Sequence, residues 1–188
     1  YELHAQDDHE SPFAQLYWTG REWSYAAFDA FYARNGTKFE KYYPESAVSD
    51  RGLNEVRAQI GEVFSESNGA VVFAGEAFGL HTRVFINSEG LPTYETKDVG
   101  LIFTKYDDYK FDRSIVITAN EQEQYMQVVL KAIEQFAPEL TRSTTHLTHG
   151  IVKMAGGVKM SSRKGNILRA TDILDAAREA NKEANGAD

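Results

Sequence analysis

The chain has 188 residues, of which 42% are hydrophobic and 26% charged, a composition that excludes an intrinsically disordered protein and suffices for one buried core. With no cysteine, disulfides and thiolate metal sites are excluded, and no apolar run is long enough to cross a bilayer, so a cytoplasmic protein is expected. The formal net charge of -8 disfavours nucleic-acid binding by the chain as a whole.

The N-terminal part, residues 1–75, is expected to be mainly helical. Residues 1–20 are polar and irregular and predict a loop, whose His and acidic residues have the spacing of no metal site. Apolar residues at helical spacing predict helices over residues 24–34 and 53–65, with an extended stretch around residues 39–44 between them. Asn68-Gly69 then predicts a turn into a strand over residues 70–74.

Strands and helices alternate in the remainder of the chain. Strands are predicted over residues 82–86, 114–118 and 147–153, and helices over residues 94–106 and 121–136. Thr93 and Thr171 are the expected N-caps of the first of these helices and of a last helix. This order predicts an α/β fold with a parallel sheet and crossover helices, with functional residues in the loops after Ile86, Thr118 and Lys153.

The most informative segment is the basic loop Lys159-Met160-Ser161-Ser162-Arg163, which follows Gly156-Gly157. Residues 153–169 include no acidic residue. Lysine, arginine and hydroxyl side chains on such a loop can bind phosphate groups, so the loop suits a nucleoside triphosphate or one contact with RNA. A solvated basic turn is the alternative interpretation.

Tyr94 and Asp98 are four residues apart, so they lie on the same face of the predicted helix. Together they can bind a guanidinium, because a carboxylate can accept two parallel N–H bonds from it. The alternative is an exposed Asp98 beside a Tyr94 at the edge of the core. Two further polar segments follow predicted strands, residues 117–125 with Gln122 and residues 146–152 with His146.

These segments, in this order, resemble the catalytic domain of the arginyl-tRNA synthetases, a class I aminoacyl-tRNA synthetase family. Residues 159–163 resemble the KMSKS motif, with Ser162 in place of its lysine. The resemblance implies that Lys159 stabilises the pyrophosphate leaving group, while Ser161, Ser162 and Arg163 hold the loop and the phosphates. It also implies an arginine site of Tyr94, Asp98 and Gln122, and ATP contacts from His146, Gly150, Val152, Lys159 and Met160. Tyr125 and His149 stand where the family commonly has other residues, so their roles are left open.

The resemblance extends from Tyr25 to Leu174 and implies a Rossmann-like domain. Residues 1–75 would then be an insert or connecting region, and residues 76–188 the second half of the nucleotide-binding fold. No His-x-Gly-His motif occurs in the chain, so we expect a fragment that is inactive when isolated.

The implied activity is ATP-dependent ligation of L-arginine to tRNA through an arginyl-adenylate, with Mg²⁺ accompanying ATP and a monomeric protein. One alternative is a non-catalytic paralogue that binds RNA or a partner. The other is a different class I synthetase, such as the cysteinyl or methionyl enzyme, which the Tyr94/Asp98 pair and the lack of cysteine disfavour.

Overall fold

The computed structural model describes residues 8–151 and 169–186. The chain divides into two compact units. One, the central unit, is Lys41–Ile151, and the other, the terminal unit, comprises Tyr1–Glu40 and Val152–Asp188. The expected functional division at residue 75 stays a prediction.

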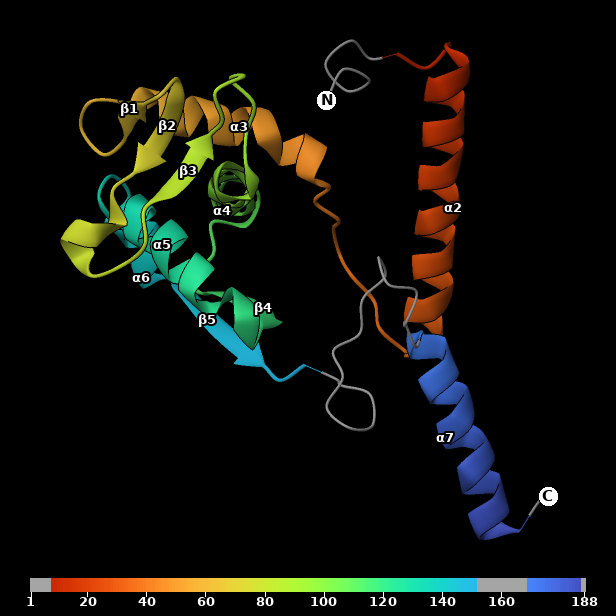
Figure 1. Ribbon diagram of the computed structural model, residues 1–188. Helices are drawn as coiled ribbons and strands as arrows, with labels where there is room; N and C mark the ends of the chain where they lie inside the picture. Colours follow the sequence, from red (N-terminus) through yellow and green to blue (C-terminus); the bar gives the residue numbers. More distant parts are fainter. Residues whose placement is uncertain (1–7, 152–168, 187–188) are drawn as a thin grey trace. The chain divides into compact units, whose positions relative to one another are not determined.

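Two helices make up the described part of the terminal unit, α2 (Pro12–Arg34) and α7 (Ala170–Asn185) (Figure 1). The predicted loop over residues 1–20 is wrong from Pro12 onward, because Ser11 accepts the Ala14 N–H and starts α2 there. Thr171 is not the N-cap of α7, because that helix begins one residue earlier, after Arg169. Among the described helices none combines the length and apolar character of a membrane span.

In the central unit a three-stranded antiparallel sheet follows α3 (Glu45–Ala58). Its strands, in spatial order, are β1 (Ser65–Ser67), β2 (Ala70–Phe73) and β3 (Arg83–Ile86). The predicted helix over residues 53–65 is wrong in its bounds, because α3 starts directly after Pro44 and ends at Ala58. The short η1 (Gly75–Phe78) connects β2 to β3.

The expected parallel α/β arrangement is found in β4 (Ser114–Ala119) and β5 (Thr144–His149), which pair in parallel from Ser114↔Thr144 to Ala119↔His149. Their connection contains η2 (Asn120–Gln122), α5 (Glu123–Glu134) and α6 (Pro138–Arg142). The expected third parallel strand, β3, belongs instead to the antiparallel sheet. The parallel pairing still brings the ends of β4 and β5 together, as expected for a ligand site.

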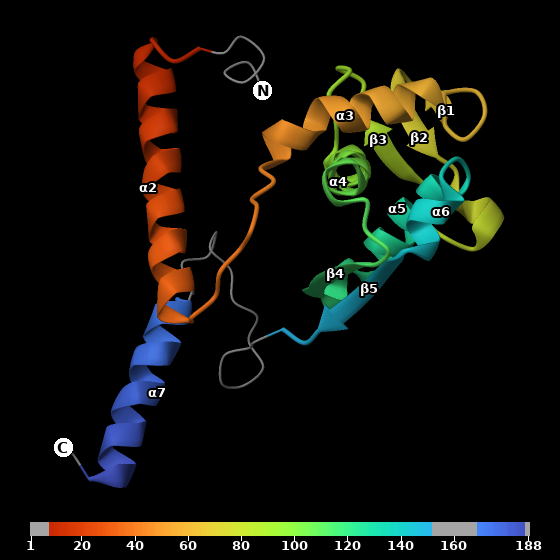
Figure 2. The same ribbon diagram turned by 180° about the vertical axis from the view of Figure 1, so that it is seen from behind.

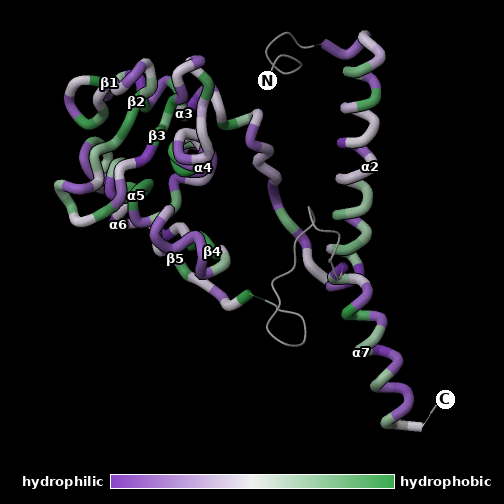
Figure 3. Tube along the Cα trace, in the orientation of Figure 1, coloured by the Kyte–Doolittle hydropathy of each residue, from purple (hydrophilic) through white to green (hydrophobic). Residues whose placement is uncertain are grey.

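The core of the central unit lies between the antiparallel sheet, α4 (Tyr94–Tyr109) and α5, and includes Phe64, Phe85, Val99 and Ile133. Figure 3 shows the hydrophobic residues along β2 and β3 that contribute to it.

Helices α3 and α4 pack closely enough for their backbones to touch, and they lie side by side in Figures 1 and 2. A Cβ atom on Gly52 would lie 1.9 Å from the Thr96 carbonyl oxygen, and one on Gly100 would lie 2.1 Å from that of Val48. Both positions therefore require glycine, and the close contact fixes the position of α4.

Candidate functional site

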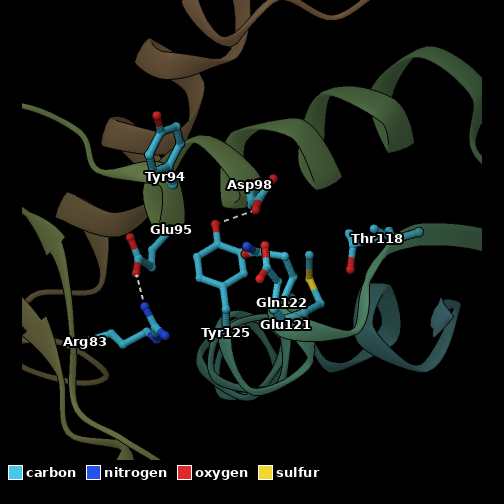
Figure 4. Close-up of a pocket in the computed structure, with 10 residues that line it drawn as sticks. Arg83, Tyr94, Glu95, Asp98, Thr118, Glu121, Gln122 and Tyr125 are labelled. Carbon is cyan, nitrogen blue, oxygen red and sulfur yellow. Dashed lines mark hydrogen bonds and ion pairs between the residues drawn. The ribbon is translucent and has the colours of Figure 1, made fainter. Parts of the chain in front are cut away.

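A cavity of about 520 Å³ opens between α4 and the start of α5 (Figure 4). Its lining comes from two short stretches of sequence, residues 83–98 and residues 116–126. The cavity brings together the three residues expected to bind arginine, which lie on two different helical segments. The lining residues are Arg83, Tyr94, Glu95, Asp98, Val116, Thr118, Glu121, Gln122, Tyr125 and Met126.

The first turn of α4 is held against β3 by hydroxyl groups. The Thr93 hydroxyl donates to the carbonyl oxygens of Val84 and Phe85, at 2.8 and 2.9 Å, and the buried Thr96 hydroxyl donates to that of Phe85 at 2.5 Å. Thr93 is the N-cap by position, but its side chain accepts no helix N–H, so the expected capping bond is wrong. These contacts fix the helical turn that carries Tyr94 and Asp98.

Asp98 is the half-buried carboxylate of the cavity, and its Oδ2 accepts a 2.5 Å hydrogen bond from the Tyr125 hydroxyl. Burial raises the pKa of Asp98, the hydrogen bond from Tyr125 lowers it, and the nearby charges of Glu95 and Glu45 raise it further. Burial also raises the pKa of Tyr125 above its ordinary value, which keeps its proton on the hydroxyl and available for donation. Tyr125, whose role the sequence left open, thus belongs to the site.

The cavity carries more negative than positive side chains. Among the residues that the structure describes, Glu95, Asp98 and Glu121 line it, whereas Arg83 is its one basic lining residue. Arg83 pairs with Glu95 at 3.0 Å, and its guanidinium lies 5.2 Å from the centre of the Tyr125 ring. The described lining therefore favours a cationic ligand over an anionic one. The sequence analysis did not identify Arg83, Glu95 or Glu121 as site residues. The order of charged residues over residues 83–98 does not indicate that Arg83 and Glu95 face one cavity, and nothing in it points to Glu121.

Gln122 ends η2 and lines the cavity from the side of α5, as expected for a residue at the end of a parallel strand. Thr118 lies at the same end of β4, and its hydroxyl is 2.8 Å from Nε2 of His146 on β5. This contact places His146 next to a lining residue of the cavity. Gly150 follows β5 and is exposed, and the carbonyl oxygen of Gly150 lies 2.8 Å from Nδ1 of His149.

The remaining residues expected to contact ATP or to hold its phosphates lie outside the described residues. They are Val152, Lys159, Met160, Ser161, Ser162 and Arg163. Within residues 8–151 and 169–186, no group of three or more His, Cys, Asp or Glu side chains has the arrangement of a metal site.

Comparison with known families matches residues 13–185 to the class I tRNA synthetases (R), catalytic domain. A curated arginine–tRNA ligase of Porphyromonas gingivalis is 31% identical over 162 residues, which cover 85% of this chain and 27% of that protein. One of Treponema pallidum is 27% identical over 175 residues, which cover 92% of this chain and 30% of that protein. The chain therefore spans between roughly a quarter and a third of the length of these relatives.

Solved structures show the same fold. The arginyl-tRNA synthetase of Plasmodium falciparum superposes with a TM-score of 0.65 at 17% identity, over 98% of this chain and 33% of that chain. That of Thermus thermophilus gives a TM-score of 0.55 at 18% identity, over 73% of this chain and 30% of that chain. At these identities the likeness establishes the α/β architecture.

Proposed function

The chain belongs to the family of class I tRNA synthetase (R) catalytic domains, and we propose that it forms the arginine-binding part of an arginine–tRNA ligase. The observation that carries this proposal is the cavity in which Tyr94, Asp98 and Gln122 meet. Its excess of carboxylates matches the permanent positive charge of a guanidinium. The Arg83–Glu95 pair compensates one of these carboxylates, which leaves Asp98 as the half-buried partner for the ligand.

The arginine side chain would enter with its guanidinium toward Asp98. A carboxylate can accept two N–H bonds from a guanidinium, and the Tyr94 ring and the Gln122 amide can contact its plane and its remaining N–H groups. Removal of this cation from water is compensated only if its charge is matched. Asp98 would supply that match, because its half-buried carboxylate lines the cavity. Burial raises the pKa of Asp98, and a guanidinium beside it would lower that pKa again.

The reaction would take place toward the ends of β4 and β5. An oxygen of the arginine α-carboxylate attacks the α-phosphorus of ATP, the bond to the bridging oxygen of the β-phosphate breaks, and pyrophosphate leaves. A hydroxyl of the terminal tRNA ribose then attacks the carbonyl carbon of the arginyl-adenylate, and AMP leaves. Positioning and charge stabilisation account for most of the catalysis of such a displacement.

The family resemblance assigns the ATP side of this reaction. His146, Gly150, Val152 and Met160 would contact ATP, and Lys159 would stabilise the leaving pyrophosphate, with Ser161, Ser162 and Arg163 holding the loop. Mg²⁺ would arrive bound to the ATP phosphates and neutralise part of their charge. A cytoplasmic location and a monomeric state remain predictions of the sequence.

Pyrophosphate exchange by the intact protein, encoded by the full reading frame, tests this function with each amino acid, in the presence and absence of tRNA. Exchange with arginine alone among the amino acids is expected. Asp98→Asn should reduce arginine-dependent exchange by about a hundredfold, because it removes the charge that matches the guanidinium.

Asp108→Asn is the matched control, since Asp108 lies on the same helix but binds Lys41 and Tyr43 instead of lining the cavity. Its exchange rate should stay within about twofold of the unchanged protein, as for other surface substitutions. A protein that exchanges with no amino acid, or equal losses in the two variants, would refute the proposed function.

A further inference from the structure

Tyr125 lines the cavity beside Asp98, the carboxylate that is proposed to bind the ligand. Its hydroxyl donates to Oδ2 of Asp98, and Figure 4 shows the two side chains facing each other across the gap between α4 and α5. The bond joins two elements that are distant in sequence, since Asp98 is in α4 and Tyr125 is in the first turn of α5. The bond therefore restricts rotation of the Asp98 side chain, which the backbone of α4 alone leaves free to rotate.

That freedom matters because the carboxyl group of an aspartate rotates about a broad, two-fold torsion. A guanidinium is planar, and its paired N–H groups require a carboxylate that lies in a matching plane. The hydrogen bond from Tyr125 selects one orientation of the Asp98 carboxylate and engages only one lone pair of Oδ2. The remaining lone pairs of both oxygens stay available for a ligand.

The ring of Tyr125 is itself held in place from a third element. The guanidinium of Arg83, on β3, lies 5.2 Å from the ring centre and is bound to Glu95 at 3.0 Å. A tyrosine has only two side-chain torsions, so this contact and the Asp98 bond together leave its hydroxyl little freedom. Glu95, Arg83, Tyr125 and Asp98 thus form a continuous chain of contacts that ends at the ligand-facing carboxylate.

On the basis of the proposed function, we propose that Tyr125 is a positioning residue for arginine recognition, because its hydroxyl orients the Asp98 carboxylate toward the plane of the guanidinium. Tyr125 acts through Asp98. An ammonium group is a point charge without a plane to match, so Tyr125 favours arginine over lysine. The family that the sequence resembles commonly has a different residue at this position, so the resemblance assigned Tyr125 no role.

The test measures dissociation constants for L-arginine and L-lysine with the intact protein, by calorimetry at pH 6, 7 and 8, together with kcat and the KM values for arginine and ATP. Tyr125→Phe removes the hydroxyl and keeps the ring over which Arg83 lies. It should weaken arginine binding about tenfold, as expected for a hydrogen bond to a charged group, and raise the KM for arginine with little change in that for ATP. Lysine binding should change less than arginine binding.

Tyr43→Phe is the matched control. The Tyr43 hydroxyl donates to the Asp108 carboxylate at 2.6 Å, so the same substitution removes the same kind of bond on the same helix α4, away from the cavity. Its arginine dissociation constant should stay within about twofold of the unchanged protein. Thermal unfolding of both variants separates positioning from a loss of fold, and Tyr125→Met provides a second variant without the hydroxyl.

The pH series and a double-mutant cycle report on how Tyr125 acts. The charged groups that surround the pair are Arg83, Glu95, Glu121 and, on α3, Glu45. Because the Tyr125 hydrogen bond lowers the pKa of Asp98, its removal should make arginine binding fall more steeply as the pH decreases from 8 to 6. When Asp98 is already replaced by asparagine, Tyr125→Phe should not weaken arginine binding further, because the carboxylate that Tyr125 orients is gone.

Equal arginine affinity in the Tyr125→Phe, Tyr125→Met and unchanged proteins would overturn the positioning role, while a weakened Asp98→Asn would still support the proposed function. Fully additive effects in the cycle would also overturn it, since Tyr125 would then act independently of Asp98. If the unchanged protein does not bind arginine, the proposed function fails first and this inference with it.

Discussion

Replacement of Gly52 by alanine should destabilise the central unit strongly, although alanine is the better helix former. The added Cβ would lie 1.9 Å from the Thr96 carbonyl oxygen, a backbone atom that cannot rotate away. Relief of this contact requires α3 and α4 to separate by about 1 Å in a packed core, with a cost of roughly 3 kcal/mol. The gain in helix propensity offsets about 1 kcal/mol, so the net loss in the free energy of unfolding is about 2 kcal/mol.

Hydrogen exchange of the intact protein, measured on peptides from α3 and α4, gives this local stability directly. Gly20→Ala is the matched control, because nothing among the described residues lies within 4 Å of a Cβ atom at this position in α2. It should stabilise its helix by up to about 1 kcal/mol. The packing argument fails if Gly52→Ala slows exchange in α3 and α4, as Gly20→Ala is expected to do in α2.

Two further predictions concern the charges of the cavity. Arg83→Met should lower the free energy of unfolding by about 1 to 3 kcal/mol, because it leaves the buried Glu95 carboxylate without its partner; the partial exposure of Arg83 limits the loss. Denaturant titration measures the loss, and a change no larger than that of Lys110→Gln, whose ion pair is exposed, would contradict it. Asp98→Asn should stabilise the unliganded protein at pH 7 while it weakens arginine binding. The folded-state pKa of Asp98 is raised, so the ionised carboxylate destabilises the fold above that pKa; the effect declines as the pH falls through the folded-state pKa and is lost below the ordinary pKa of the unfolded state. Unfolding curves should show a larger gain in the free energy of unfolding at pH 7 than at pH 4, and a loss at pH 7 would contradict this prediction.

The local part of the site could be predicted from the sequence. Tyr94 and Asp98 were placed on one helical face by their spacing alone, and the structure has them in one cavity. Gln122 required the family resemblance, because nothing in its local pattern distinguishes it from Gln124. The bond between Tyr125 and Asp98 could not be predicted, since it depends on how α4 and α5 are packed.

The topology was predicted in part, and its errors have physical causes. The parallel pair β4–β5 follows from a connection long enough to hold a crossover helix. The segment between β2 and β3, residues 74–82, is shorter than the roughly dozen residues that a parallel crossover requires, so those strands pair antiparallel. The start of α2 was signalled by Ser11-Pro12, an N-cap followed by proline, which the polar composition of residues 1–20 obscured.

Every described residue that lines the cavity belongs to one of two short stretches, residues 83–98 and residues 116–126. The first stretch runs from β3 through a turn to the first turn of α4, and the second runs from β4 through η2 to the first turn of α5. The remainder of the central unit holds the two in place. Under the proposed function, the residues that would select the amino acid occupy only these two short stretches of the described sequence. An exchange of these two stretches between related proteins would transfer the described cavity lining together, and the proposed recognition of the amino acid could then diverge without a change in the supporting fold.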